Sequence, residues 1–223
     1  MCTSTLEGKA ETGAGTGFVL TGWYLGIPVM VWLYGWIQPW VAWPLIVLLL
    51  WSLLSLRPSA AEGVRYQAGK WGLLAGLVLC AAMVFVIGFD GHVQQTFDFI
   101  ARNAIYSDLI HREWPVCYPD GRYLLYPSHF WLVPTLCARV FPSLDTLSLQ
   151  LWSFAGFALL FWNLTYRMGW VKAFFAILCL LSLCSLTTIT DNVLNVVFNE
   201  DAIYAATFGM PSNLSQFFNT FNY

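Results

Sequence analysis

The residues that could do chemistry in this chain are few and lie mainly in two polar stretches. Among 223 residues there are 10 Lys and Arg and 12 Asp and Glu. One stretch begins with Asp90 and His92 after an apolar run, and the other begins with Asp191 and includes Glu200 and Asp201. A carboxylate at the end of an apolar helix can accept a proton from a reacting hydroxyl, or it can simply cap the helix. Glu200 and Asp201 have the charge to hold a divalent cation with Asp90, but adjacent side chains diverge on most backbones.

Other charged residues fit structural roles as well as chemical ones. Asp98 and Arg102, and likewise Asp108 and Arg112, are four residues apart, a spacing that forms ion pairs on a helix surface. Such pairs are more often surface contacts than parts of a site. His129 stands in an apolar run, where a hydrogen-bonded structural histidine is more common than a ligand.

The amino-acid composition indicates the kind of environment in which these residues are placed. Hydrophobic residues make up 58% of the chain and charged residues 10%, against about 25% charged residues in a soluble domain. A chain this apolar is typical of a helical protein that crosses the bilayer several times. The net charge of −2 and the scattered basic residues exclude a nucleic-acid partner.

The cysteines do not form a recognisable framework. The chain has six cysteines with no CxxC pair. Cys117 and Cys137 could meet on the outer side, but their spacing does not favour a disulfide. Thiols inside apolar runs pack like small hydrophobic side chains.

Apolar runs predict about five spanning helices. The runs cover residues 18–37, 40–56, 71–89, 146–166 and 171–190. The first two form a hairpin, 18–56, with a turn at Gln38-Pro39. Residues 1–17 are polar and rich in Gly and Thr, and they are predicted to be a disordered tail without the basic segment of a signal peptide.

Loop charges orient these helices. Residues 57–70 carry Arg57, Arg65 and Lys70 against Glu62, so the positive-inside rule makes this loop and the N-terminus cytoplasmic. The third helix then runs outward, and 90–145 is an outer loop. We place the chain in the inner (plasma) membrane as a multi-pass protein of the cell envelope.

One amphipathic helix is predicted in the outer loop, over 92–113. This helix would lie along the membrane surface with its apolar stripe toward lipid or protein. That stripe consists of Val93, Phe97, Ile100, Ala104 and Leu109. The polar side is expected to face water, and it includes Asp98, Arg102 and Asp108.

The segment 123–141 is ambiguous, because it is long enough to span but contains His129, Arg139 and two prolines. It could span or lie at the interface as a second interfacial or re-entrant helix. If it does not span, Arg167 and Lys172 fall in the cytoplasm, which obeys the positive-inside rule. We therefore favour five spans, with 90–145 and 191–223 both outside.

The order of these elements resembles a known family. Gly-Phe-Asp-Gly-His at 88–92 ends the third apolar run, and Asp-Phe-Ile-Ala-Arg-Asn-Ala-Ile follows at 98–105. Asp-Leu-Ile at 108–110, Trp-Pro-Val at 114–116 and a helical hairpin ending at Asp191 complete the pattern. Over about 71–191 the chain resembles the N-terminal part of C-type (GT-C) integral membrane glycosyltransferases, most of all bacterial members. The hairpin before residue 71 is additional, and the ending at 191–223 is expected to be truncated.

The resemblance implies a chemistry. Enzymes of this family take a sugar from a polyprenyl-phosphate carrier at the outer membrane face and pass it to an acceptor. Asp90 matches the family's first-loop acid and would act as general base, and Asp191 would orient the acceptor or support a metal. The departing phosphate would be bound by basic side chains. These are His92, Arg102, His111 and Arg112.

The implied cofactor and the competing functions stay open. The chain has no DxD pair at Asp90, which leaves the use of a divalent cation undecided. A non-catalytic subunit of a membrane complex is the main alternative. A transporter is disfavoured because the apolar runs contain almost no polar or Gly/Pro-broken centre. The partners expected are therefore the lipid bilayer and a lipid-linked sugar donor, while the sugar, the acceptor and the oligomeric state are not readable.

Overall fold

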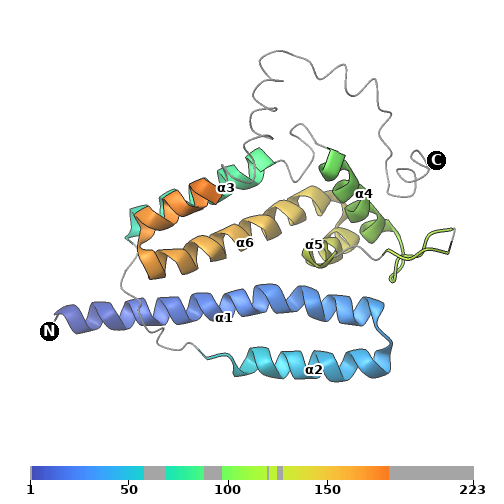
Figure 1. The fold of residues 1–223 in the computed structure, drawn as a ribbon, viewed down its shortest axis with the longest axis horizontal. Helices are drawn as coiled ribbons and strands as arrows, with labels where there is room; N and C mark the ends of the chain where they lie inside the picture. The colour runs from blue at the N-terminus through green and yellow to red at the C-terminus, as the bar shows by residue number, and fades with distance from the viewer. Residues whose placement is uncertain (1, 58–68, 88–96, 120, 125–127, 181–223) are drawn as a thin grey trace, which may run out of the picture. The chain divides into compact units, whose positions relative to one another are not determined.

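The computed structural model describes residues 2–57, 69–87, 97–119, 121–124 and 128–180 (Figure 1). Expectations for Asp90, His92, Asp191 and the acidic pair at 200–201 lie outside these residues. The chain divides into two compact units. Unit 1 comprises Met1–Val84 and Trp152–Cys184, and unit 2 comprises Phe85–Leu151 and Ser185–Tyr223.

The described residues are mostly helical and contain no strand, only an isolated antiparallel bridge between Cys117 and Tyr123. This confirms an all-helical fold. The helices are α1 (Cys2–Trp36), α2 (Pro39–Ser55), α3 (Lys70–Ile87), α4 (Phe97–His111), α5 (His129–Val140) and α6 (Asp145–Met168). A short 3-10 helix, η1 (Pro142–Leu144), precedes α6, and a further apolar helix, Trp170–Leu180, follows it.

The apolar runs correspond closely to helices, because their ends carry clear local signals. α2 begins at Pro39, whose missing N–H would have no partner in the first turn anyway. α6 ends where Gly169 adopts a φ of 85°, and the Gly169 N–H donates to Thr165 O at 2.9 Å. A left-handed glycine is a common helix terminator. The chain re-enters a helix at Trp170, so a single residue separates the last two described helices.

The N-terminal tail is where the structure differs from the sequence expectation. α1 begins at Cys2, so residues 2–17, predicted to be disordered, are helical. The segment contains Leu6, Glu7, Lys9, Ala10 and Glu11, which are all good helix formers. Extending a helix that already exists adds one hydrogen bond per residue without the cost of nucleation. The apolar helix that follows therefore propagates toward the N-terminus.

Among the described residues, two helices are long and apolar enough to cross a membrane, Gly15–Trp36 and Pro142–Met168. Three shorter apolar helices accompany them, Pro39–Ser55, Lys70–Phe85 and Trp170–Leu180. Membrane association is thus indicated by length and composition. The count of five spans stays a prediction.

α1 and α6 are joined in unit 1 by polar and aromatic contacts. The rings of Tyr24 and Trp152 stack with centroids 4.2 Å apart, and the Tyr24 hydroxyl donates to Trp152 O at 3.1 Å. Further along, Asn163 Nδ2 donates to Thr21 Oγ1 at 2.9 Å and to Leu159 O at 2.8 Å. Hydrogen bonds of this kind hold helices together in surroundings where water cannot compete for the donors.

Two glycines allow apolar helices of unit 1 to approach closely. A Cβ placed at Gly26 would lie 2.7 Å from Leu53 Cδ1, so α1 meets α2 at this glycine. A Cβ at Gly76 would overlap the ring of Phe161, so α3 meets α6 there. Small residues at such crossings let the helix backbones come together. Figure 1 shows α1 and α2 running side by side as an antiparallel hairpin.

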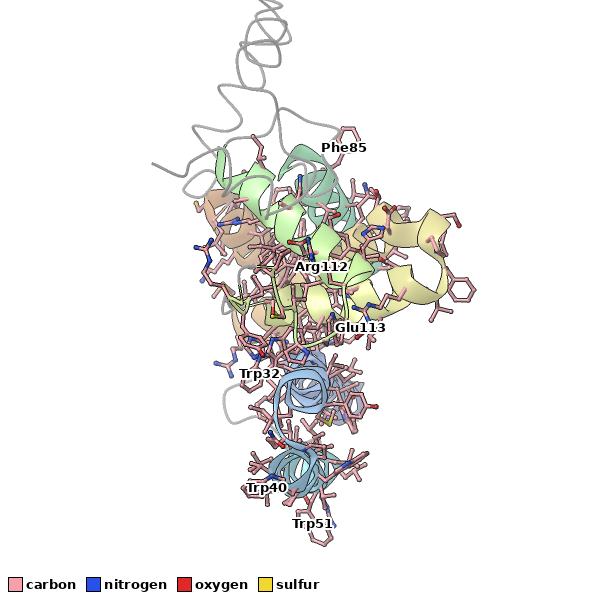
Figure 2. All side chains as sticks on the ribbon, turned by 90° about the vertical axis from the view of Figure 1, so that its right-hand side faces the viewer. Trp32, Trp40, Trp51, Phe85, Arg112 and Glu113 are labelled. Atoms are coloured by element: carbon pink, nitrogen blue, oxygen red, sulfur yellow. The ribbon has the colours of Figure 1, made fainter. Side chains whose placement is uncertain are left out.

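The outer face of α2 is bare and apolar. Within α2 only Ala42 and Leu53 are buried, while Trp40 and Trp51 are 76% and 73% exposed. Figure 2 shows both tryptophans projecting from α2. A helix that is apolar all round is normally found in a protein core or in a membrane. Since α2 is not in the core of its own unit, its outer face needs a non-aqueous neighbour.

The Gly76 contact provides a stability test. Gly76→Leu should lower the free energy of unfolding by about 1–3 kcal/mol, because the larger side chain must displace the Phe161 ring. Gly69→Leu is the matched control, since nothing lies within 4 Å of a Cβ at Gly69. Thermal unfolding of both variants in the same detergent, followed by circular dichroism, makes the comparison. Equal melting of the two variants would mean that α3 does not pack against α6 at this point.

Candidate functional site

Three of the six site residues expected from the sequence are described, Arg102 and His111 on α4 and Arg112 directly after its last residue. Arg102 is half-buried and His111 is exposed. About ten residues at the helical rise separate Arg102 from Arg112 by about 15 Å along the axis. His111 and Arg112 are neighbours in sequence but contact different groups, Ser107 O and Asp108 Oδ1, and Arg102 lies apart from them.

The carboxylate of Asp108 is the centre of a polar group at the end of α4. Asp108 is only 3% exposed. Arg112 Nε donates to its Oδ1 at 2.8 Å, and the Tyr118 hydroxyl donates to its Oδ2 at 3.0 Å. The Arg112 guanidinium also lies over the Tyr118 ring, 5.3 Å from its centroid. Both carboxylate oxygens are thus engaged.

This burial corrects the sequence-based expectation that Asp108 faces water. The ion pair with Arg112 is confirmed, but the pair does not sit on a solvated helix face. The chain after α4 folds back, so that Tyr118 covers the second carboxylate oxygen. A buried charge is tolerated when it is paired and hydrogen-bonded. The i,i+4 spacing alone gave no sign of Tyr118.

Arg139 of α5 caps the C-terminal end of α4. Its Nε and Nη2 donate to Leu109 O at 3.1 and 2.7 Å, and Nη2 also donates to Arg112 O. The guanidinium lies 4.4 Å from the centroid of the Trp114 ring, and Trp114 Nε1 donates to the same Leu109 carbonyl at 3.0 Å. The last carbonyls of a helix lack partners within the helix and carry partial negative charge. A cation placed there donates hydrogen bonds to these carbonyls and offsets their partial negative charge.

Desolvation lowers the pKa of Arg139 below its ordinary value. Arginine has so high an intrinsic pKa that the guanidinium nevertheless keeps its proton near neutral pH. We refer to Asp108, Arg112, Trp114, Tyr118 and Arg139 as the Asp108 cluster.

A tight turn places Tyr118 in this cluster. The Tyr118 N–H donates to Arg122 O at 2.8 Å, and the Gly121 N–H donates to Tyr118 O at 2.9 Å. Gly121 has a φ of 80°, a left-handed conformation that glycine adopts without strain. The Leu124 N–H then donates to Val116 O at 3.0 Å, next to the bridge between Cys117 and Tyr123.

A second set of hydrogen bonds connects α4 with the start of α6 inside unit 2. The Tyr106 hydroxyl donates to Asp145 O at 2.8 Å and lies 3.2 Å from Ser148 Oγ. Burial raises the pKa of the Tyr106 hydroxyl, which keeps the phenol neutral. Ser148 Oγ also lies 3.1 Å from Pro134 O, so α4, α5 and α6 meet at these side chains.

This geometry limits which of the described residues can act chemically. Asp108 is a poor general base, because both of its oxygens already accept hydrogen bonds. Exposed His111 lies with Nδ1 2.9 Å from Ser107 O, and only a protonated Nδ1 can bond to a carbonyl. His111 can therefore donate to an outside anion only from Nε2 of the protonated ring. Among the described residues, no three His, Cys, Asp or Glu side chains gather to hold a metal ion.

Comparisons of the chain with protein-family models, with curated proteins and with solved structures found no match.

The Asp108 cluster predicts a selective loss of stability. Asp108→Asn should lower the free energy of unfolding by about 1–3 kcal/mol, because Arg112 loses its charged partner in a largely buried setting. Glu113→Gln changes the same charge at an exposed neighbouring position and should cost less than about 0.5 kcal/mol. Chemical unfolding of the two variants in one detergent measures the difference. If both variants unfold at the same denaturant concentration as the parent, Asp108 does not hold the end of α4.

Proposed function

We propose that this protein is a multi-pass membrane glycosyltransferase that uses a polyprenyl-phosphate-linked sugar at the outer membrane face. The observation that carries the proposal is the order of elements. The apolar helix α3 is followed along the chain by α4 and α5, which are not among the candidate spans of the described residues, and then by the apolar helix α6. This is the order for which the sequence resembles GT-C enzymes, and the proposal includes five spanning helices with a cytoplasmic N-terminus.

The length of α5 supports a non-spanning segment in the outer loop. α5 has 12 residues and begins directly after Ser128. At 1.5 Å per residue it extends about 18 Å, short of the roughly 30 Å of a hydrocarbon core. The stretch 123–141, ambiguous in the sequence, therefore contains a helix too short to span. This length supports the arrangement that keeps Arg167 and Lys172 in the cytoplasm, which is part of the proposal.

The proposed chemistry assigns one role to each charged group. The acceptor hydroxyl gives its proton to Asp90 as its oxygen bonds to the anomeric carbon of the sugar. The bond from that carbon to the carrier phosphate breaks, and the phosphate leaves on the lipid. Basic side chains stabilise the negative charge that develops there. Among the described candidates, exposed His111 suits this role better than Arg112, whose charge Asp108 already offsets.

Topology is the first test. We expect residues 57–70 and 167–172 to face the cytoplasm, and 90–145 and the segment after Asp191 to face outward, because cationic loops stay inside. Single cysteines at positions 113 and 167 can be labelled in intact cells with a membrane-impermeant maleimide. Both side chains are exposed, which makes them a matched pair. Labelling at 113 alone is expected, and labelling at 167 alone would contradict the arrangement.

Catalysis is the second test. Asp90→Asn keeps the size of the side chain but removes the proton acceptor, so sugar transfer should fall by roughly 100- to 10,000-fold. Glu113→Gln is the control, since it removes one exposed carboxylate that has no assigned role in the reaction and should leave the rate nearly unchanged. Transfer is measured in reconstituted vesicles from a radiolabelled polyprenyl-linked sugar.

The two ways in which this test can fail are distinguishable. If the parent transfers sugar and Asp90→Asn keeps pace with it, the general-base assignment is wrong while the transferase survives. If the folded parent consumes none of a panel of lipid-linked sugars, the transferase itself is wrong.

A further inference from the structure

The outward face of α5 is apolar, although it is not covered by the described chain. One side of α5 packs into unit 2 through Trp131, Leu132, Pro134, Thr135 and Ala138, which are all buried. The opposite side presents Leu136, Cys137, Val140 and the capping residue Phe141. Val140 and Phe141 are 68% and 58% exposed. We call these four residues the α5 stripe.

α4, in the same unit, has a different outer surface. Its accessible positions include Arg102, Asn103 and Ser107, which are half-buried, and His111, which is exposed. Figure 2 shows Arg112 and Glu113 at the end of α4. The two helices of one compact unit thus differ, because α4 offers polar groups where α5 offers hydrocarbon. Water solvates the polar side chains of α4 well, but its contact with the apolar side chains of α5 is unfavourable.

The α5 stripe continues along the chain into α6. The Phe141 N–H donates to Cys137 O and the Leu144 N–H donates to Phe141 O, each at 2.9 Å, so the chain turns tightly out of α5. Leu144, Leu147 and Leu151 follow, and all three are exposed. They belong to Pro142–Met168, one of the two segments apolar enough to cross a membrane. Exposed Ser143 and Asp145 lie among them, so it is these three leucines that continue the apolar surface of α5 toward the candidate span.

A fixed cation marks the edge of the α5 stripe. Arg139 lies between Cys137 and Val140 in sequence, and its guanidinium is turned to Leu109 O and Arg112 O and stacks on Trp114. Arginine and tryptophan favour the headgroup region, where one end of the side chain meets hydrocarbon and the other meets polar groups.

We infer that α5 is an interfacial helix whose stripe, Leu136, Cys137, Val140 and Phe141, inserts into the outer leaflet. The partner is a lipid surface. Continuity with the exposed side chains of Leu144, Leu147 and Leu151 favours lipid over a second protein, and Arg139 with Trp114 fits the headgroup level. The stripe would reach about 5–10 Å below the headgroup boundary, as interfacial helices do. The inference depends on the membrane location of the chain but not on sugar transfer.

Two native cysteines of unit 2 provide the test. Cys137 lies on the α5 stripe, and Cys117 is exposed in the turn after α4. Two full-length variants are made, each retaining one of these thiols, with Ser or Ala at the other five cysteines. Each thiol is labelled with an environment-sensitive fluorophore, and the protein is reconstituted in phosphatidylcholine and phosphatidylglycerol vesicles. The probes are iodide in the buffer and a nitroxide attached to a shallow acyl carbon of the lipid.

The label at Cys137 should emit at shorter wavelength, and the lipid nitroxide should quench it several-fold more strongly than the label at Cys117. Iodide should show the reverse preference. Iodide quenching of Cys137 equal to that of Cys117 would place the stripe in water and overturn the inference. Protection of Cys137 from both quenchers would mean that protein covers the stripe, either another segment of this chain or a second copy, and would overturn it equally. Val140→Cys in the same background repeats the measurement one helical turn away.

Discussion

The structure depends on one constraint, which is that apolar helices must be covered by something other than water. The backbone groups of α1, α2, α3 and α6 are satisfied within each helix, as hydrocarbon requires. The side chains of these helices, by contrast, are not all buried within the described residues. α2 buries only Ala42 and Leu53 and leaves its tryptophans exposed, so the described residues supply little of its surroundings. The length and composition of the apolar helices suggest membrane association, and in a bilayer the hydrogen bonds of unit 1, such as that of Asn163 with Thr21, would gain strength because water is excluded.

The same constraint explains how unit 2 is built. Unit 2 carries more than half of the chain's charged residues, and Asp108, Arg112 and Arg139 near the end of α4 are satisfied by one another, by Tyr118 or by backbone carbonyls. Arg112 forms an ion pair with Asp108, and Arg139 donates hydrogen bonds to the last carbonyls of α4. The guanidinium groups of Arg112 and Arg139 also lie over aromatic rings. Near a membrane surface the dielectric constant is lower than in water, so an unpaired charge would be costly and a paired one is held firmly. The cluster thereby fixes α4 against α5.

Local sequence signals predicted the helices well but not their contacts. Hydrophobic runs located α2, α3 and α6, and Pro39 and Gly169 fixed helix ends through their own backbone chemistry. The helical state of residues 2–17 was missed because polar composition was given more weight than propagation from the adjoining helix.

The buried position of Asp108 was missed because Tyr118, which covers it, reaches it through a turn and not through helical periodicity. No local pattern could have assigned Arg139 to Leu109, since the two residues are 30 positions apart in the sequence. The general-base assignment of Asp90 comes from the family resemblance and lies outside the described residues.

Hydrogen exchange in lipid nanodiscs tests the central claim that a bilayer covers what the chain leaves bare. Amides of α2 should exchange slowly, over hours, because both their hydrogen bonds and their surroundings exclude water. Amides of the turn at 117–124, which is largely outside any helix, should exchange within seconds to minutes. Mass spectrometry of peptides from one sample gives both rates. Exchange of α2 as fast as that turn would contradict the account, because it would show that α2 faces water.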